Sequence, residues 1–197
     1  MKVKVILLTL VLLTAFFTGC TQPAPTPEPT PEQEQAETPP QTTPPETTPD
    51  VVTTASIVDT EDAFEKAISS TDGTWIIATL KDLTFDKELV LDGEYKNGKK
   101  DADGKDVIQR KIALYEQDEN RNVTARYTLT APKLTINSPN ARIQSGTFKG
   151  DVYVSADNFE LVDATVDGNV YFTTDEAKAT FKMDDTSKVT GKQELKK

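Results

Sequence analysis

Two tyrosines recur at equivalent places 18 residues apart, and each follows a polar side chain by two positions. Asp151 precedes Tyr153 and Asn169 precedes Tyr171, with one valine between them in both cases. Residues two apart in an extended strand lie on the same face, so all four side chains are expected on one surface. Aromatic rings stack on the apolar faces of sugars, while carboxylate and amide groups hydrogen-bond the hydroxyls. These four residues are the predicted ligand-binding site, and its predicted ligand is a polysaccharide.

The same residues also have a simpler interpretation. Equivalent side chains on neighbouring strands form ladders that stabilise a sheet, at about 0.2–1 kcal/mol for each cross-strand pair. Lys149 and Asp167, which occupy neighbouring positions in the two copies, are explained in the same way as an ion pair on the surface. The sequence alone leaves both interpretations of the tyrosines open.

Residues able to carry catalysis are few. The chain has no histidine and a single cysteine, which excludes Ser-His triads, histidine-based metal sites and Cys-x-x-Cys redox pairs. No spacing among the remaining charged residues defines the paired carboxylates of a glycoside hydrolase. We therefore expect no catalytic residue and no cofactor, although catalysis stays open. The cations considered as candidates are Arg110, Lys111, Arg126 and Arg142.

Two groups of acidic residues invite comparison with calcium sites. The first lies near Gly104, but it lacks the full Asp-x-Asp-x-Asn-Gly frame and its terminal glutamate. The second surrounds the predicted ligand-binding site and has no defined geometry in the sequence. A solvated loop explains the first group better, and we predict no metal site. The first group is Asp101, Asp103 and Asp106. The second is Asp151, Asp163 and Asp167 together with the amide residue Asn169.

The tyrosines belong to an internal repeat that must position them. Residues 143–154 align with residues 161–172, with Thr, Gly, Val and Tyr in phase. Three apolar clusters in each copy predict a three-sided coil, and Gly150 and Gly168 are expected at corresponding corners. A third, degraded copy over 181–195 has Gln193 in place of a core valine, which suits a terminal cap. The clusters are Ala141/Ile143, Phe148 and Val152/Val154, then Phe159/Leu161, Val166 and Val170/Phe172.

The preceding residues predict one helix followed by short strands. Asp59-Thr60 is the expected N-cap of a helix that places Ala63, Phe64, Ala67 and Ile68 on one face. Residues 95–106 are expected to form a loop, and residues 116–122 the tip of a hairpin. The β-rich stretches that predict strands are 74–80, 83–85, 89–91, 107–115, 125–130 and 133–136.

A helix followed by stacked short strands resembles a small parallel β-helix of the pectate-lyase-like kind. The resemblance extends over residues 56–195, and the clear repeat lies in the last third. It implies a mainly β fold: a short parallel β-helix, or solenoid, with an N-terminal capping α-helix. A β-sandwich is the alternative fold.

The N-terminus has the features of an export signal. Lys2 and Lys4 precede an apolar run over 5–17, which is too short to span a bilayer as a helix. Phe17-Thr18-Gly19-Cys20 follows and resembles the lipobox of bacterial lipoproteins. The resemblance implies acylation of Cys20 and anchoring at the extracytoplasmic face of the cell membrane. An ordinary secretory cleavage site is the alternative.

The next segment differs sharply in composition. Residues 21–54 hold ten of the twelve prolines and no aromatic residue, so they cannot form a core. A polyproline-like tether of this length reaches on the order of 100 Å. We therefore predict a signal peptide over 1–19, a lipidated cysteine and disordered tether over 20–54, and one domain over 55–197. The formal net charge of −10 makes nucleic acid an unfavourable partner.

These observations favour a non-catalytic lipoprotein that binds a polysaccharide or cell-wall polymer at the cell surface. One alternative is a structural protein whose coils stack end to end, since bactofilin-like polymer formers resemble it in their short coils. The other is a small polysaccharide lyase, because lyases of the β-helix class have a similar fold.

Overall fold

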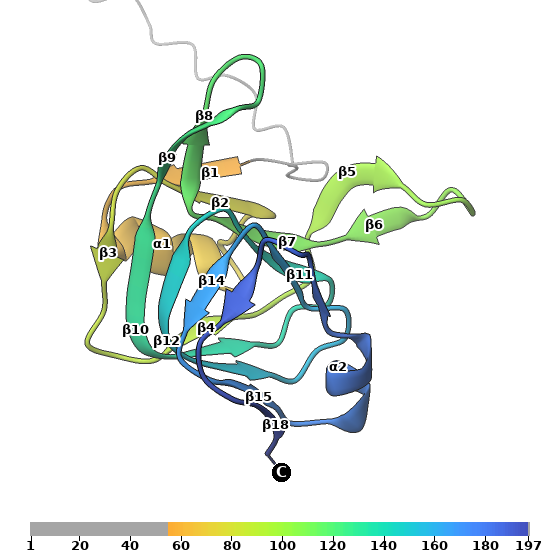
Figure 1. Ribbon diagram of the computed structural model, residues 1–197. Helices are drawn as coiled ribbons and strands as arrows, with labels where there is room; N and C mark the ends of the chain where they lie inside the picture. The colour runs from red at the N-terminus through yellow and green to blue at the C-terminus, as the bar shows by residue number, and fades with distance from the viewer. Residues whose placement is uncertain (1–54, 197) are drawn as a thin grey trace, which may run out of the picture. The chain divides into compact units, whose positions relative to one another are not determined.

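The computed structural model describes residues 55–196, which form a mainly β structure with parallel sheets (Figure 1). The predicted signal peptide, Cys20 and the tether lie outside the described residues. The first sheet has six strands, and every neighbouring pair in it is parallel. Its order is β1 (Ala55–Val58), β2 (Ile76–Thr79), β7 (Arg110–Ala113), β11 (Ala141–Gln144), β13 (Glu160–Val162) and β16 (Lys182–Met183).

The second sheet contains two long strands, β10 (Thr128–Ile136) and β12 (Thr147–Val154), which are parallel neighbours. The first part of each pairs with one set of short strands and the last part with another. Each long strand thus contributes to two stretches of sheet. The first set is β3 (Leu83–Thr84) and β14 (Thr165–Asp167), and the second is β4 (Leu89–Leu91) and β15 (Val170–Phe172). Beyond them, β17 (Lys188–Val189) pairs with β14, and β18 (Gln193–Leu195) pairs with β15.

Small residues allow the backbones to approach where these strands change partners. Pairing of β10 with β12 is interrupted between Thr130 and Lys133, opposite Gly150. Gly150 has a φ of +140°, and a Cβ there would lie 1.9 Å from the carbonyl oxygen of Ala131. A Cβ on Gly168 would lie 2.0 Å from the carbonyl oxygen of Gly150. Close stacking is therefore the reason for glycine at 168, while at 150 the positive φ also favours glycine.

The expected 18-residue register is found in both sheets. Ile143 pairs with Leu161 in the first sheet, and Val152 pairs with Val170 in the second. All members of the predicted apolar clusters are buried. The third copy is also present, since Gln193 pairs with Val170, but its step is longer because a helix is inserted.

Two further corners use residues other than glycine. Asn140 and Asn158 have φ values of +53° and +58°, and Ser145 and Asp163 have values of +57° and +52°. Each pair is separated by one repeat, as Ser145 and Asp163 are 18 residues apart. Short polar side chains tolerate the left-handed region better than other side chains. The hydroxyl of Ser145 also donates to Oδ2 of Asp163 at 3.0 Å, which links one corner to the next.

Two short helices accompany the sheets. The expected helix is α1 (Glu61–Ile68), whose N-cap Thr60 accepts a hydrogen bond from the Ala63 amide at 3.2 Å. Its Phe64 is buried against Phe85, with ring centroids 5.5 Å apart. The second helix, α2 (Asp175–Thr180), was not predicted. It lies next to Phe181, whose ring packs on Phe159 and Phe172.

Two hairpins extend from the ends of β7 (Figure 1). The first joins β5 (Lys96–Lys100) to β6 (Asp106–Ile108), so the prediction of a loop over 95–106 is wrong. The second joins β8 (Tyr115–Gln117) to β9 (Val123–Arg126), which confirms the predicted hairpin tip over 116–122. The stretch 107–115, predicted as one strand, contains parts of β6 and β8 as well as β7.

Candidate functional site

The two predicted tyrosines lie side by side on the outer side of the second sheet. Tyr153 in β12 pairs in register with Tyr171 in β15, and their ring centroids are 5.0 Å apart with the planes at 47°. Both side chains are half-buried, while the valines and phenylalanine beside them in the strands are buried. The surface formed by Tyr153, Tyr171 and the two lysines over their rings, Lys133 and Lys196, is called the tyrosine face.

Two lysines lie over these rings. The Nζ atom of Lys133 is 4.8 Å from the centroid of Tyr153. The Nζ atom of Lys196 is 4.4 Å from the centroid of Tyr171 and 5.1 Å from that of Tyr153. Lys196 also donates a hydrogen bond to the Tyr153 hydroxyl at 2.8 Å, and this bond raises the pKa of Lys196. Lys133 also forms a salt bridge with Glu88 at 3.0 Å. The tyrosine face therefore combines two aromatic rings with two ammonium groups, one of which is paired with a carboxylate.

Asp151 and Asn169 are joined to each other. Oδ1 of Asp151 accepts from the backbone amide of Asn169 at 2.9 Å and from its side-chain Nδ2 at 2.8 Å. Oδ1 of Asn169 in turn accepts from the backbone amide of Lys192 at 2.9 Å. These bonds continue from one repeat to the next beside the tyrosines. The pair thus has a structural role that the sequence prediction did not include, and it holds the neighbouring strands in register.

The other candidate cations do not gather at one site. Arg110 is fully buried, with its guanidinium donating to the carbonyl oxygens of Ala67 at 2.5 Å and Ile68 at 3.2 Å. Arg126 forms a salt bridge with Asp163 at 2.7 Å, and Arg142 forms one with Glu160 at 2.6 Å. Lys111 is half-buried beside the rings of Trp75 and Tyr115, whereas the ring next to Arg110, that of Tyr95, packs on its buried guanidinium.

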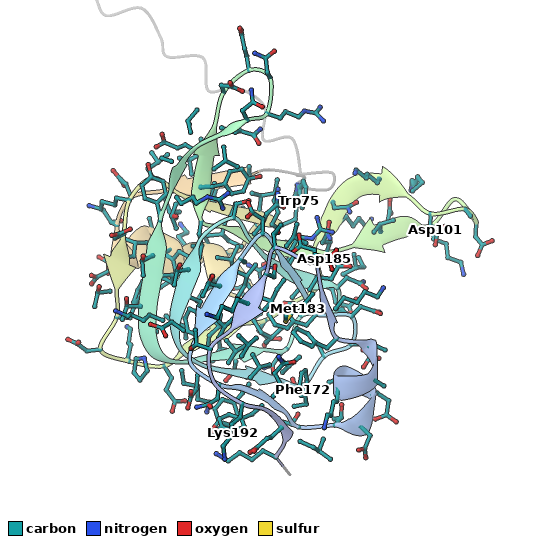
Figure 2. The ribbon with its side chains drawn as sticks, in the orientation of Figure 1. Trp75, Asp101, Phe172, Met183, Asp185 and Lys192 are labelled. Carbon is teal, nitrogen blue, oxygen red and sulfur yellow. The ribbon has the colours of Figure 1, made fainter. Side chains whose placement is uncertain are left out.

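The acidic groups considered for calcium are engaged within the protein. Oδ1 of Asp101 accepts from the backbone amides of Asp103 and Lys105, which closes the turn between β5 and β6 at the tip of the first hairpin (Figure 2). Asp106 bridges Lys100 at 2.5 Å and Lys96 at 2.9 Å, and hydrogen bonds from these lysines lower its pKa. Over residues 55–196, no three acidic or cysteine side chains are grouped so that they could hold a metal ion.

Members of the second acidic group are also bonded to neighbours. Asp163 binds Ser145 and Arg126, and Oδ1 of Asp167 accepts from the Thr190 hydroxyl at 3.1 Å. Asp167 also lies opposite Lys149 in the register of β12 and β14, but the predicted ion pair between their side chains is not among the salt bridges of residues 55–196. These bonds join successive repeats, so the aspartates act as parts of the ladders that hold the strands together.

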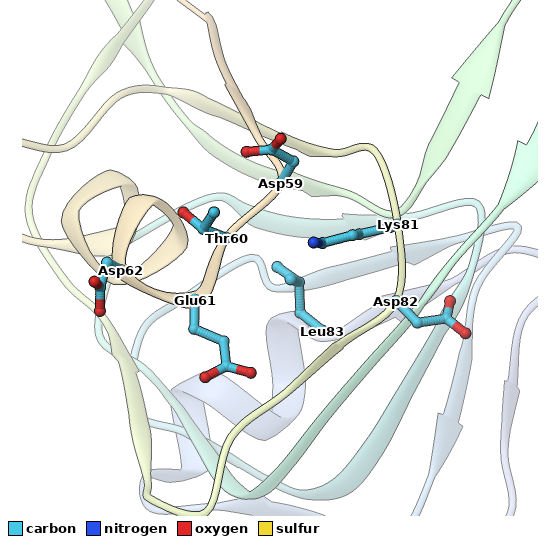
Figure 3. Close-up of a pocket in the computed structure, with 7 residues that line it drawn as sticks. All are labelled: Asp59, Thr60, Glu61, Asp62, Lys81, Asp82 and Leu83. Carbon is cyan, nitrogen blue, oxygen red and sulfur yellow. The ribbon is translucent and has the colours of Figure 1, made fainter.

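A hollow of about 390 Å³ lies beside the first turn of α1 (Figure 3). Asp82 in its wall accepts a hydrogen bond from the Thr128 amide at 2.7 Å, and Thr60 caps the helix. The side chains shown in Figure 3 are mostly acidic and include a single cation, Lys81. Thr60 and Asp82 therefore have structural roles, and the lining has no aromatic residue on which a sugar could stack. Its lining residues are Asp59, Thr60, Glu61, Asp62, Lys81, Asp82 and Leu83.

The sequence prediction missed Trp75 and Tyr115 as site residues. Trp75 lies near the base of the β5–β6 hairpin (Figure 2), and Tyr115 begins the β8–β9 hairpin. A usable signal was present, because Lys111 alternates with the inward-facing Ile112 and so had to point outward from its strand. The partners of Lys111 come from a distant segment and a hairpin, which the sequence pattern does not bring together.

Comparison with protein-family models, with curated proteins and with solved structures finds no match for this chain. In the described part of the chain, no helix has the length and apolar character needed to cross a membrane.

Proposed function

We propose that this chain is a lipid-anchored, extracytoplasmic surface module that binds an acidic polysaccharide or cell-wall polymer through the tyrosine face. In this proposal the module acts by binding, without catalysing a reaction. The observation that carries the proposal is the pair of stacked tyrosines with Lys133 and Lys196 over their rings.

The geometry supports a sugar ligand with negative charge. Tyr153 and Tyr171 present neighbouring, half-buried rings to one side of the sheet, where the apolar face of a pyranose can stack. Lys133 and Lys196 provide ammonium groups within 5 Å of these rings, where they can pair with carboxylates or phosphates of the same polymer. For Lys133 this contact replaces its surface salt bridge with Glu88. A polymer of repeated sugar units can contact both rings, because Tyr153 and Tyr171 occupy equivalent positions in two copies of one repeat.

The proposed fold is a short parallel β-helix with α1 as its N-terminal cap. Parallel pairing throughout both main sheets supports it, as do the 18-residue steps between β12 and its neighbours β14 and β15. A β-sandwich is disfavoured, since its sheets are antiparallel.

End-to-end stacking of such coils is disfavoured by the last strands. The final edge carries charged residues on all three strands, including Lys182, Lys188 and Glu194. Charged side chains on edge strands oppose pairing with another chain. The proposed module therefore acts as a single copy on its anchor.

The proposed membrane attachment rests on Cys20 in its lipobox-like context. The test compares the chain with its Cys20→Ser variant in a bacterial host fed radiolabelled palmitate. We expect label and membrane fractionation for the original chain and neither for the variant. Equal labelling of the two would overturn the proposed acylation.

The proposed binding is tested on an array that carries uronic acid polymers, teichoic acids and neutral glucans. The full chain in detergent solution is compared with the Tyr153→Ala/Tyr171→Ala variant and with Tyr127→Phe, which changes a tyrosine elsewhere. We expect binding to one or more acidic polymers, at least tenfold weaker in the double variant and retained by the control. Preference for neutral glucans, or unchanged binding by the double variant, would refute the proposed site.

A further inference from the structure

A second cluster of aromatic rings and cations lies where the two hairpins meet the first sheet. The strand between the hairpins is β7, which begins two residues after β6 and ends two residues before β8. Lys111 in β7 faces outward, because Arg110 and Ile112 on either side of it are buried. Lys111 therefore lies on the short strand from which both hairpins extend (Figure 1).

Two aromatic rings flank the ammonium group of Lys111. Its Nζ atom lies 5.9 Å from the ring centroid of Trp75 and 5.9 Å from that of Tyr115. The backbone amide of Lys111 donates to the carbonyl oxygen of Trp75 at 2.7 Å, which fixes the two residues relative to each other. All three side chains are half-buried, so their surfaces are still accessible in part.

The charges around Lys111 are mainly positive. Lys111 pairs across the sheet with Arg142, and the nearest carboxylate in that row, Glu160, is already held by Arg142 at 2.6 Å. Burial lowers the pKa of Lys111, and repulsion from Arg142 and Lys99 lowers it further. Within residues 55–196, no salt bridge joins Lys111 to a carboxylate.

A partly desolvated ammonium group among other cations is unfavourable unless an anion approaches it. Nothing in the packing of β7 requires a lysine at this position, since the side chain points away from the core. The two rings add a surface on which an apolar ring face can stack. An anionic group carried on a sugar ring satisfies both features at once.

We propose that Trp75, Lys111 and Tyr115 form a second binding site, which takes an acidic sugar residue. Its ring stacks on Trp75 or Tyr115, and its carboxylate pairs with Lys111. The site extends the proposed function in that it takes the same class of ligand, but it lies on the other main sheet and uses none of the residues of the tyrosine face. Two sites on one anchored module would let a single polymer chain or two neighbouring chains bind with higher avidity.

Trp75 allows this site to be observed by itself, because it is the only tryptophan in the chain. The experiment titrates the full chain in detergent solution with oligogalacturonate and records tryptophan emission. We expect a saturable change in emission that weakens with added salt, and no such change with a neutral cello-oligosaccharide.

Variants then assign the change to Lys111. Lys111→Gln should weaken the apparent affinity at least tenfold, while Lys111→Arg keeps the charge and should retain binding. Lys149→Gln removes one exposed positive charge from β12 and serves as the matched control. Circular dichroism of each variant verifies that it is folded.

The outcomes separate this site from the tyrosine face. Unchanged emission on titration, or equal affinity in Lys111→Gln and the original chain, would overturn the proposed second site. Loss of the emission change in the Tyr153→Ala/Tyr171→Ala variant would also overturn it, because the signal would then depend on the tyrosine face. A retained emission change in that variant, with loss of array binding, supports two separate sites.

Discussion

The tyrosine face and the Trp75–Lys111–Tyr115 cluster use the same residue types in opposite ways. At the tyrosine face, Lys196 is exposed and donates to Tyr153, and this bond raises its pKa. In the cluster, Lys111 is half-buried beside two rings, and burial lowers its pKa. The first lysine has a partner within the protein that stabilises its charge. The second has aromatic neighbours and nearby cations, which makes it the stronger candidate for binding an external anion.

The two regions also differ in the secondary structure that holds their side chains in place. The tyrosine face lies on strands in an 18-residue register, with the Asp151–Asn169 pair and the stacked glycines next to it. The cluster lies where hairpins interrupt this regularity, beside the buried Arg110. Substitutions in the regular repeats and substitutions beside the inserted hairpins should therefore change the free energy of unfolding by different amounts.

Arg110 ties the hairpin region to α1. Its guanidinium donates to the carbonyl oxygens of Ala67, Ile68 and Ser69 at the end of α1, and also to that of Asp92. The last carbonyl groups of a helix lack partners within it. Arg110 adds to the bonds that these three groups accept from Thr74, Asp92 and Tyr95. The ring of Tyr95 packs on the guanidinium, 4.3 Å away, and burial lowers the pKa of Arg110 to about 10.

The largest expected effect is that of Arg110→Met. The variant removes several hydrogen bonds from a buried guanidinium, each worth about 1.5–3 kcal/mol, including the one that Arg110 donates to the carbonyl oxygen of Asp92. We expect the free energy of unfolding to fall by at least about 3 kcal/mol, as measured by urea denaturation of the full chain. Arg126→Met is the control, because Arg126 is exposed and its salt bridge with Asp163 should contribute only about 0–1 kcal/mol. Equal losses for the two variants would contradict the role given to Arg110.

Gly168→Ala tests the support of the tyrosine face. The added Cβ would collide with the carbonyl oxygen of Gly150, so the strands must move apart at a cost of about 1–3 kcal/mol. Thermal unfolding should show this loss, while Lys149→Ala on the exposed side of the same bend should stay within about 0.5 kcal/mol. A neutral Gly168→Ala would mean that the backbones are farther apart than in the structure.

The sequence predicted the regular region well and the interrupted region poorly. The pairing of Tyr153 with Tyr171 followed from the 18-residue period, because parallel strands one repeat apart place equivalent residues together. The β5–β6 hairpin was missed because its strands are rich in lysine, glycine and aspartate and lack alternating apolar residues; ion pairs from Asp106 to Lys96 and Lys100 join them.

Two other features were missed for different reasons. Helix α2 is too short to show apolar periodicity, although its Thr174 N-cap followed by acidic residues repeats the pattern at the start of α1. Arg110 alternates in phase with the buried Ile112, which marked it as inward-facing. Its carbonyl partners come from distant segments, so the sequence offered no sign of how the charge is satisfied.

The smallest expected effect concerns the two lysines themselves. A titration of the lysine side chains by NMR should place the pKa of Lys111 below 10.5 and that of Lys196 above it. Lys196 therefore contributes stability below pH 10.5, which is lost as the pH rises through its folded value. Lys111 has the opposite effect, because its charged form is less favourable in the folded state. This unfavourable contribution to stability disappears as the pH rises from the pKa of Lys111 in the folded protein to 10.5. The same pKa for both lysines would remove the contrast between the two regions.

The most direct test of polysaccharide binding uses the five tyrosines of the chain, Tyr95, Tyr115, Tyr127, Tyr153 and Tyr171. NMR of the full chain with isotope-labelled tyrosine, titrated with oligogalacturonate, observes both proposed sites and two internal controls together. We expect the ring signals of Tyr153 and Tyr171 to shift in a saturable way and those of Tyr95 and Tyr127 to stay in place. A shift of Tyr115 would add the second site. Signals of Tyr153 and Tyr171 that do not move at saturating oligogalacturonate would contradict binding at the tyrosine face.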